Sequence, residues 1–489
     1  MKLKDLIEEI EYISVSGNTD IEINKIEYSS KKIENNDIFF AIKGYKDDGE
    51  KYIGEAINKG AKVIFVEGKI ISELVNDITY IIVENIRITM SLLAAKYYNF
   101  PAKQLKLIGI TGTKGKTTTA FMIRDILLAS GKKTGMIGTV SITYADVTIT
   151  SERTCPESLD LHRLFKDMVD KEIEYVVMEV SSHALELNRV NGLQFAVSAF
   201  TNLSEEHLDF HKDMEEYLKA KSKLFKLSDF ALINGDDIYS NSLLKLIDCK
   251  YAKFGIDNEV NLSASDIRIN SGYVEFKMYV NKMLETIHIN IPGRFTVYNA
   301  LAAIGVTSML NCQMDAILLA LANVKVPGRS EIVDIGKTFT VMVDYAHNPS
   351  SLEAILISTK KYVKGRIILV FGCGGDRDTF KRSVMGEIAG KYANFTVITT
   401  DNSRSELPRK IMVMIENGMK KTSGLYKIIE DRKLAIAFAM KIAWTNDMII
   451  VAGKGHETYQ IIGDKKIFFD DKEVIKTIAS EMQDKNFEA

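Results

Sequence analysis

One segment restricts the possible folds more than any other: a glycine-rich loop between a predicted strand and a predicted helix. Residues 105–110 read LKLIGI, an apolar run that predicts a buried strand, and residues 120–130 predict a helix that ends at Gly131. Between them lies TGTKGKTTT. Backbone N–H groups of such a loop bind phosphate, while its lysine and the following hydroxyl contact the terminal phosphates and Mg²⁺. The segment therefore predicts an α/β domain that binds a nucleoside triphosphate.

The loop departs in one respect from the pattern G-x-x-x-x-G-K-[ST]. Ile110 occupies the first glycine position, and Gly109 lies one residue earlier. A glycine-rich turn without a ligand is the alternative, but a Lys-Thr pair between a strand and a helix favours phosphate binding. The loop residues that we predict to contact the nucleotide are Gly112, Thr113, Lys114, Gly115, Lys116, Thr117 and Thr118.

Acidic and imidazole groups follow the neighbouring strands of the same predicted sheet. The run 173–178 predicts a strand that is followed by Glu179, where a carboxylate can hold Mg²⁺. The strand predicted at 195–200 leads to His207 and His211. Packing on a helix face is the alternative for both histidines. We expect Glu179 and His207 to lie at the same sheet edge as the phosphate loop.

The pattern of strands and helices divides the 489-residue chain into three parts. Residues 1–102 predict a small α/β domain, and residues 103–328 a central domain with an antiparallel excursion near 261–291. Residues 329–489 alternate strands with helices, which predicts a parallel sheet.

Each predicted strand of the third part ends in a charged or glycine-rich turn. Because ligands bind at the carboxyl edge of open α/β sheets, we expect a site there. Arg377 and Arg404 suit carboxylates, and Glu457 suits an ammonium group, so the site fits a zwitterionic amino acid with a further charged end. Two such edges that face one another would form a cleft between domains.

Composition excludes several other classes of protein. The formal net charge is -2 with no basic block, so we expect no nucleic-acid partner. The four cysteines lie far apart, which argues against disulfides and zinc and for a reducing compartment. The sequence contains no signal segment and no apolar run of membrane-spanning length, so we expect a cytoplasmic protein without a membrane span. We also expect a monomer.

At these residues the chain resembles the Mur ligase family over nearly its whole length. The resemblance implies three α/β domains: a domain for the UDP-MurNAc-dipeptide (1–102), a central P-loop ATPase domain (103–328) and a Rossmann-like C-terminal domain for the incoming amino acid (329–489). The motifs that carry it are Ser29 with the Gly44–Gly49 turn, TGTKGKTTT, EVSSHAL, NLSEEHLDFH, GRFTVYNALAA, VPGR, DYAHNP, FGCGGDRD, DNSR and GKGHE.

The resemblance also implies roles for individual residues. Lys221 falls where these ligases carry a carbamylated lysine that helps to hold Mg²⁺. The predicted catalytic residues are Lys116, Glu179, His207 and Lys221, and the predicted metal ligands are Thr117, Glu179, His207 and Lys221. Further nucleotide contacts are predicted at Asn299, Arg329 and Asp344. The residues predicted to bind the UDP-MurNAc-dipeptide are Ser29, Thr154, Cys155, Ser181 and Arg189. Those predicted to bind the amino acid are Arg377, Asp401, Asn402, Ser403, Arg404, Gly453 and Glu457.

Three positions depart from the family's motifs. Cys155 replaces the second threonine of a TTP turn, Ser403 replaces the proline of DNPR, and Ser30 lies where an arginine commonly follows Ser29. The arginine of DNPR is retained as Arg404, which in this family accompanies enzymes that use meso-diaminopimelate.

The function implied is an ATP-dependent ligase that adds a diamino acid, meso-2,6-diaminopimelate, to UDP-N-acetylmuramoyl-L-alanyl-D-glutamate through an acyl phosphate, in peptidoglycan precursor synthesis. L-Lysine or lanthionine as the added amino acid, and a sibling ligase of the folylpolyglutamate type, are the alternatives. From another class, a catalytically silent nucleotide-binding protein would keep the same fold. The predicted metal-side carboxylate argues against such a protein, because simple binding does not need it.

Overall fold

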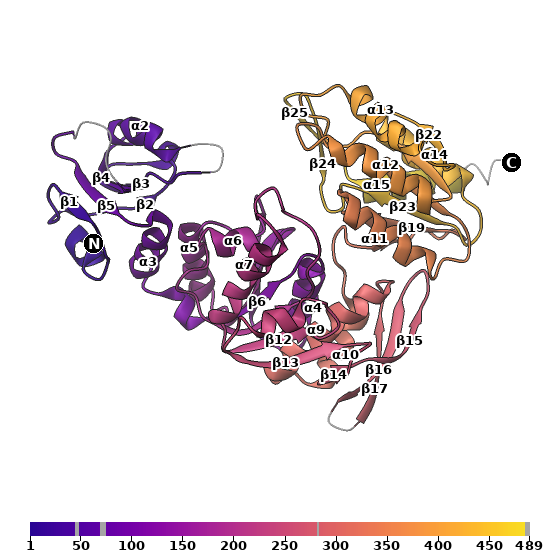
Figure 1. The fold of residues 1–489 in the computed structure, drawn as a ribbon, viewed down its shortest axis with the longest axis horizontal. Coiled ribbons are helices and arrows are strands. Elements are labelled where there is room, and N and C mark those ends of the chain that lie inside the picture. Colours follow the sequence, from indigo (N-terminus) through magenta and orange to yellow (C-terminus); the bar gives the residue numbers. More distant parts are fainter. Residues whose placement is uncertain (45–47, 69–74, 281–282, 485–489) are drawn as a thin grey trace. The chain divides into compact units, whose positions relative to one another are not determined.

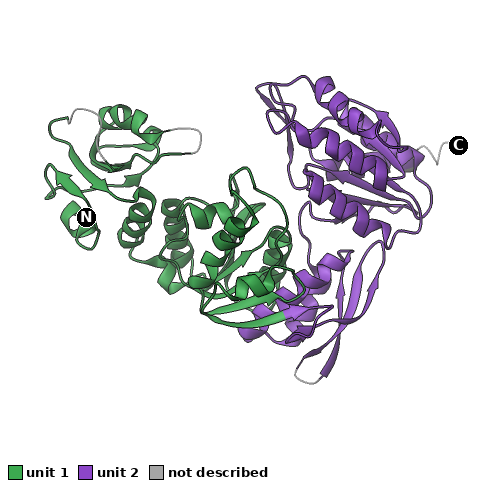
Figure 2. Ribbon diagram, viewed as in Figure 1, with its two compact units in different colours: residues 1–253 green, residues 254–489 purple. Residues whose placement is uncertain are grey.

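The computed structural model describes residues 1–44, 48–68, 75–280 and 283–484. The chain forms two compact units, residues 1–253 and 254–489 (Figure 2). The boundary between them falls inside the predicted central domain. Within the described residues, no helix is both long and apolar enough to cross a membrane.

The first unit begins with a small five-stranded sheet (Figure 1). Its strand order is β1-β5-β4-β3-β2, with β1 antiparallel to β5 and the other neighbours parallel. Alternate side chains of these strands fill two apolar cores, one around Phe40 and Phe65 and one around Phe39 and Ile64. The elements are α1 (Leu3–Ile7), β1 (Ser14–Ser16), β2 (Ile26–Glu27), η1 (Ser30–Lys32), β3 (Asp37–Phe40), η2 (Gly49–Tyr52), α2 (Ile53–Asn58), β4 (Ala61–Glu67), β5 (Thr79–Val83), α3 (Ile86–Tyr97) and η3 (Pro101–Gln104).

A second sheet of this unit carries the phosphate loop. Its strands run in the order β13-β12-β11-β6-β10-β7-β8-β9. The strand before the loop, β6, is central and pairs in parallel with β10 and β11. The loop therefore emerges from the middle of the carboxyl edge, as the sequence predicted. The elements are β6 (Lys106–Thr111), α4 (Lys116–Ala129), β7 (Thr134–Ile137), β8 (Ser141–Tyr144), β9 (Val147–Thr150), α5 (Ser158–Asp170), β10 (Tyr175–Glu179), α6 (Ser182–Glu186), β11 (Phe195–Phe200), α7 (Met214–Lys226), β12 (Phe230–Asn234), α8 (Ser240–Leu244) and β13 (Lys250–Gly255).

The second unit begins with the antiparallel excursion that the sequence predicted. Strands β15, β16 and β17 form a three-stranded antiparallel sheet, and α10 packs against β17. The short β14 pairs with residues 254–255 at the end of β13. The elements are β14 (Leu262–Ser263), β15 (Ser265–Ile269), β16 (Val274–Val280), β17 (Met283–Ile289), α9 (Arg294–Met309) and α10 (Met314–Asn323).

The rest of the second unit is a six-stranded sheet in the order β18-β19-β23-β20-β21-β22. Only β18, at one edge, is antiparallel to its neighbour. Helices cover both faces over separate apolar cores, so four strand ends present their turns at a single edge. The elements are β18 (Glu331–Val333), β19 (Thr340–Asp344), α11 (Pro349–Lys360), β20 (Ile367–Phe371), α12 (Phe380–Tyr392), β21 (Phe395–Ile398), α13 (Pro408–Met419), β22 (Leu425–Ile428), α14 (Arg432–Ile442), β23 (Met448–Ala452), β24 (Tyr459–Ile462), β25 (Lys465–Phe468) and α15 (Asp471–Asp484).

Candidate active site

Two glycines give the phosphate loop its shape. Gly115, with φ +86°, is the last residue before α4, and Gly112 has φ +149°. A Cβ on Gly112 would lie 1.9 Å from the Thr201 hydroxyl, so the loop can pass the end of β11 only without a side chain there. The loop is also tied down by Asn202, whose side-chain oxygen accepts a hydrogen bond from the Lys114 N–H at 2.9 Å.

Lys116 holds its charge at the loop itself. Its ammonium group donates to the carbonyls of Gly112 (2.8 Å) and Thr113 (3.0 Å). These contacts fold the side chain back over the loop, where it lies beside the N–H groups at the start of α4. A cation beside the N-terminus of a helix forms an anion site, which fits the predicted contact with phosphates.

Thr117 and Glu179 meet at the carboxyl edge of the sheet. The Thr117 hydroxyl donates to Glu179 Oε2 at 2.9 Å. Thr139 donates to the same carboxylate twice, from its backbone N–H (2.8 Å) and its hydroxyl (3.0 Å). A Cβ on Gly138 would lie 2.4 Å from Glu179 Oε1, so the carboxylate fills the space left by that glycine. A hydroxyl and a carboxylate side by side are the oxygen donors that Mg²⁺ takes from proteins, so this pair fits the ion.

Lys221 is buried against the same loop. Its side chain is 1% exposed, its ammonium group donates to the Gly112 carbonyl at 3.0 Å, and it lies 4.4 Å from the centre of the Tyr217 ring. Burial, together with the nearby Lys116 charge, lowers the pKa of Lys221 well below its usual value. An uncharged amine is the form that can accept carbon dioxide, so this surrounding suits the predicted carbamate.

The predicted histidines pack in an aromatic cluster next to Lys221. The His207 ring lies 4.9 Å from that of His183 and 6.2 Å from that of Tyr217, and His211 stacks on Tyr217 at 4.9 Å. His211 also hydrogen-bonds Ser182 Oγ at 2.9 Å. Burial and the neighbouring histidines lower the pKa of His183 to about 4. Among the described residues, no three His, Cys, Asp or Glu side chains converge as a metal cluster, so the role of His207 as a ligand stays a prediction.

The residues predicted for the UDP-substrate gather near this edge, apart from Ser29. The Thr154 hydroxyl lies 3.1 Å from that of Thr139, which links it to the Glu179 carboxylate. Arg189 donates to the Cys155 carbonyl at 3.2 Å. The Cys155 thiol is 1% exposed, and burial raises its pKa to about 12.

The remaining two residues of this set occupy helix starts. Ser181 is the N-cap of α6 and accepts a hydrogen bond from the Ala184 N–H at 3.2 Å. Ser29 precedes the 3-10 helix η1, on the smaller sheet's side of the unit. The neighbouring Ser30, where an arginine is common, donates to Glu55 at 2.8 Å. Residues 45–47 of the predicted Gly44–Gly49 turn lie outside the described residues.

In the second unit, several polar side chains surround Glu457. Its carboxylate accepts from Asn402 Nδ2 at 2.9 Å and lies 3.4 Å from the ammonium of the fully buried Lys454. Burial raises the pKa of Glu457 despite that cation. Gly453, with φ +111°, leaves room for Asp401, because a Cβ there would lie 2.6 Å from Asp401 Oδ2.

Arg404 is held by a neighbouring hairpin. The Arg404 backbone N–H donates to the Ile461 carbonyl at 3.1 Å, and its carbonyl accepts from Gly463 at 2.8 Å, so the strands β24 and β25 fix its position. The Arg404 guanidinium donates to the Gly375 carbonyl at 2.6 Å. The Ser403 hydroxyl is buried and finds no hydrogen-bond partner within the described part of the chain. Arg377 is exposed and takes part in none of the ion pairs of the described residues.

Arg329 and Asp344, two of the predicted nucleotide contacts, lie close together. Asp344 ends β19 and accepts from the N–H groups of Ser330 (2.7 Å) and Ala346 (2.8 Å), while burial raises its pKa. The Arg329 guanidinium lies 4.7 Å from the Tyr345 ring centre, and its buried Nε has no acceptor among the residues that the structure describes. The third contact, Asn299, is buried in α9.

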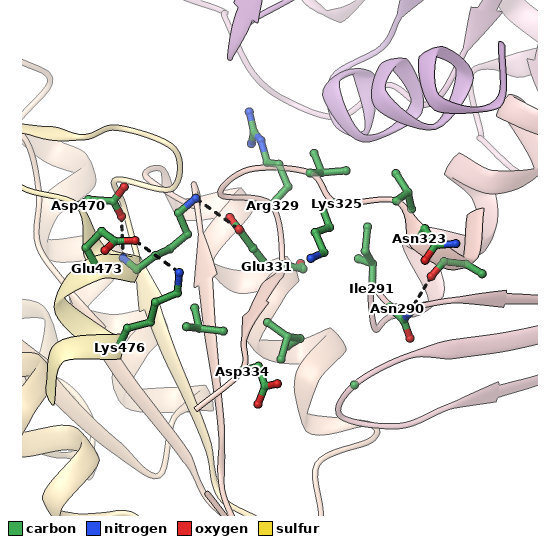
Figure 3. A pocket seen from close by; sticks show the side chains of 18 residues that line it. Asn290, Ile291, Asn323, Lys325, Arg329, Glu331, Asp334, Asp470, Glu473 and Lys476 are labelled. Carbon is green, nitrogen blue, oxygen red and sulfur yellow. Dashed lines mark hydrogen bonds and ion pairs between the residues drawn. The ribbon is translucent and has the colours of Figure 1, made fainter. Parts of the chain in front are cut away.

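A cavity of about 660 Å³ lies along the linker that carries Arg329. In Figure 3, Arg329 extends away from Glu331, which pairs with Lys472 at 3.4 Å. The charges of the lining are balanced, so the cavity favours no ion of one sign. The cations are Lys325, Arg329, Lys472 and Lys476, and the carboxylates are Glu331, Asp334, Asp470 and Glu473.

Several residues of these sites escaped the sequence analysis. Asn202 and Lys454 lie inside motifs that were recognised, and their position after strand ends was the signal for them. Thr139 carries no local signal, because its partner Glu179 is distant in sequence, and a single tyrosine such as Tyr217 forms no periodic pattern.

The fold and the first site define a class: multidomain α/β proteins with a phosphate-binding loop on a central parallel strand. Three family models match consecutive segments: the Mur ligase family catalytic domain (residues 22–98), the Mur ligase middle domain (110–307) and the Mur ligase glutamate ligase domain (328–455). The chain belongs to the Mur ligase family, which confirms the resemblance and the three-domain α/β architecture predicted from it.

Named relatives resemble the chain over its full length. A UDP-N-acetylmuramoyl-L-alanyl-D-glutamate–2,6-diaminopimelate ligase of Caldanaerobacter subterraneus subsp. tengcongensis is 46% identical over 99% of this chain and 100% of the relative. The ligase of the same name from Clostridioides difficile is 43% identical over 99% and 100%. A solved structure of a ligase with this name superposes with a TM-score of 0.71 at 26% identity, covering 99% of both chains. MurF from Acinetobacter baumannii, at 18% identity and a TM-score of 0.64 over 98% of both chains, shares the fold.

Proposed function

We propose that this chain is the ligase that joins meso-2,6-diaminopimelate to UDP-N-acetylmuramoyl-L-alanyl-D-glutamate at the expense of ATP, in the cytoplasmic synthesis of peptidoglycan precursors. The observation that carries the proposal is the phosphate loop with Lys116 folded over it and the Thr117–Glu179 pair at 2.9 Å beneath it. Relatives more than 40% identical over the whole chain bear the name of this activity.

The reaction requires that two anions meet. A carboxylate of the dipeptide's D-glutamate attacks the γ-phosphorus of ATP, the bond to the β-phosphate oxygen breaks, and an acyl phosphate and ADP result. Lys116 and the N–H groups of the loop neutralise the charge that would otherwise keep the carboxylate and the triphosphate apart. When bound, Mg²⁺ would supply further positive charge at the phosphates, held by Thr117 and Glu179 and, in our proposal, by His207 and carbamylated Lys221.

In the second half of the reaction, we propose that the sheet edge of the second unit binds the amino acid. An uncharged amine of the diamino acid attacks the acyl carbon, phosphate leaves, and an amide forms. We assign the ammonium end of the amino acid to Glu457 and a carboxylate to Arg404, with Arg377, Asp401, Asn402, Ser403 and Gly453 around them. Acyl phosphates hydrolyse in water, so the reaction requires that water be kept from the intermediate. The domain bounds in this proposal are 1–102, 103–328 and 329–489.

An amino-acid panel tests this proposal. Phosphate release is measured with ATP, the UDP-dipeptide and, in turn, diaminopimelate, lanthionine or L-lysine. We expect release that needs both the UDP-dipeptide and an amino acid, and the largest kcat/KM with diaminopimelate. Preference for lysine or lanthionine would overturn the assigned amino acid, and nucleotide binding without any release would indicate a silent binding protein. Gel filtration and light scattering, in which we expect a monomer, test the proposed assembly state.

A further inference from the structure

Three arginines surround one carboxylate next to the residues predicted to bind the UDP-substrate. Glu157 Oε1 lies 2.6 Å from Arg153 Nη1 and 2.9 Å from Arg189 Nη2, and Glu157 Oε2 lies 2.8 Å from Arg87 Nη1. The Glu157 side chain is only 6% exposed. We call these four residues the Glu157 cluster.

The position of Glu157 at a helix start is not explained by capping. Glu157 is the N-cap of α5, yet its side chain makes no capping hydrogen bond. The carboxylate instead turns to the arginines. A buried carboxylate needs strong hydrogen bonds to offset its lost contact with water. Because Glu157 makes no capping bond, the guanidinium groups supply these charge-assisted bonds instead.

The Glu157 cluster joins segments that are far apart in sequence. Arg87 is in the first turn of α3, which packs against α5, and its Nη2 also reaches the Lys43 carbonyl at 3.5 Å. Arg189 follows α6 and donates to the carbonyl of Cys155. The Glu157 cluster thus connects Lys43, which precedes the Gly44–Gly49 turn, with the segment that contains Thr154 and Cys155.

The Nε–H of Arg189 is available to a further acceptor. Its Nη1 contacts the Cys155 carbonyl and its Nη2 contacts Glu157, while its Nε is buried and has no hydrogen-bond partner among the described residues. A buried donor without an acceptor destabilises the protein, and an incoming anion would relieve that cost. Three guanidinium groups against one carboxylate also leave the cluster with two excess positive charges.

We propose that Glu157 is a positioning residue for the acidic substrate: it fixes the guanidinium of Arg189 so that the free donor meets a carboxylate of the muramoyl-peptide. The inference deepens the proposed function and rests on it. Arg189 was predicted as a substrate contact, whereas Glu157, Arg87 and Arg153 were not. Without Glu157, the three cations repel one another and Arg189 loses the geometry that one carboxylate gives it.

The test measures binding and turnover separately. The dissociation constant of the UDP-MurNAc-dipeptide is determined by titration calorimetry without ATP, and KM values for all three substrates are determined with ATP. For Glu157→Gln we expect a weakening of the UDP-dipeptide by at least about 10-fold in Kd and KM, as for the loss of one charged hydrogen-bond partner. The KM of ATP should stay within about 2-fold, because the phosphate loop does not contact this cluster.

Two further variants separate positioning from support of the fold. Glu157→Asp keeps the charge with a shorter arm, so its Kd should lie between those of the wild type and Glu157→Gln, and it serves if the glutamine variant does not fold. Glu186→Gln is the matched control, because Glu186 pairs with Lys223 at 2.7 Å with both side chains 44% exposed, and it should bind as the wild type does.

The outcomes are distinct for the inference and for the proposed function. A wild type that binds no UDP-dipeptide overturns the proposed function and the inference with it. A wild type that binds and Glu157 variants of unchanged affinity, or variants in which the KM values of ATP and UDP-dipeptide rise equally, overturn the inference alone.

Discussion

The two sheet edges differ in how their charges are held. In the first unit, Lys116 and Lys221 are held by backbone carbonyls, those of Gly112 and Thr113 for the former and of Gly112 for the latter, all within one loop. In the second unit, Glu457 is held by side chains, that of Asn402 from another turn and that of Lys454 from its own turn. The two lysines of the first edge are thus held by the backbone of one loop, whereas the carboxylate of the second edge is held by side chains, one of them from a distant turn.

Whether backbone or side chains hold the charged groups predicts which substitutions each sheet edge tolerates. A site that is held by its own backbone loses function mainly through the reacting side chain. A site that is assembled from several turns loses its geometry whenever one partner changes. The predictions below test this contrast.

The largest effect is expected for Lys116→Ala. It removes the cation over the phosphate loop but leaves the loop's backbone contacts with Asn202, so kcat should fall by about 10³-fold while the UDP-dipeptide still binds. Phosphate release and calorimetry measure the two quantities. Lys106→Ala, at the exposed start of β6, is the control and should be fully active. Turnover close to the wild type in Lys116→Ala would remove the lysine from the mechanism.

Lys221→Ala should reduce kcat by about 10²-fold, because it removes the proposed carbamate but not the Thr117–Glu179 pair. Acetate or propionate should restore part of the activity by supplying a carboxylate in the space that the side chain leaves. Lys219→Ala, which breaks only the surface pair with Glu215, is the control. Failure of every short carboxylate, together with a mass spectrum that lacks the added carbon dioxide, would contradict the modification.

Arg404→Ala should act mainly on the amino acid. We expect the KM of diaminopimelate to rise by about 10²-fold with little change in the KM of ATP, because a charged hydrogen-bond partner of a carboxylate is lost. Arg409→Ala, on the exposed face of α13, is the control. An unchanged KM for diaminopimelate would show that the turn of Asp401–Arg404 does not hold its carboxylate.

The smallest effect concerns one histidine of the second unit. Burial, with the charges of Arg329, Lys472 and His347, lowers the pKa of His456 to about 4. Between pH 6.5 and 4 the unfolded chain therefore binds a proton there that the folded chain does not, so stability falls as the pH falls. His456→Gln should lessen this loss by roughly 1–2 kcal/mol at pH 5. Urea unfolding at pH 7 and pH 5 measures it, with the exposed His288→Gln as the control. Equal pH dependence in both variants would contradict the lowered pKa.

The contrast between contacts within one segment and contacts between distant segments also explains which parts of the fold and the site could be predicted from the sequence. The strand, loop and helix around Lys116 were predicted because each is written in consecutive residues, and the structure places Thr117 beside Glu179 as expected. The hairpin of β24 and β25 was not predicted, although it fixes Arg404. The backbone of Arg404 bonds to Ile461 and Gly463, which are distant in sequence, so no local pattern indicates the pairing. Thr139 and Glu157 were missed because a single threonine or glutamate gives no periodic signal.

The burial of Cys155 has a practical consequence for chemical labelling. Alkylating reagents attack the thiolate, and a thiol with a pKa near 12 and 1% exposure supplies almost none at neutral pH. Cys312 and Cys373 are buried as well, whereas Cys249 is partly exposed. Maleimide dyes should therefore attach to Cys249 first in the native protein, which offers a fluorescent reporter on the first unit without any engineered cysteine.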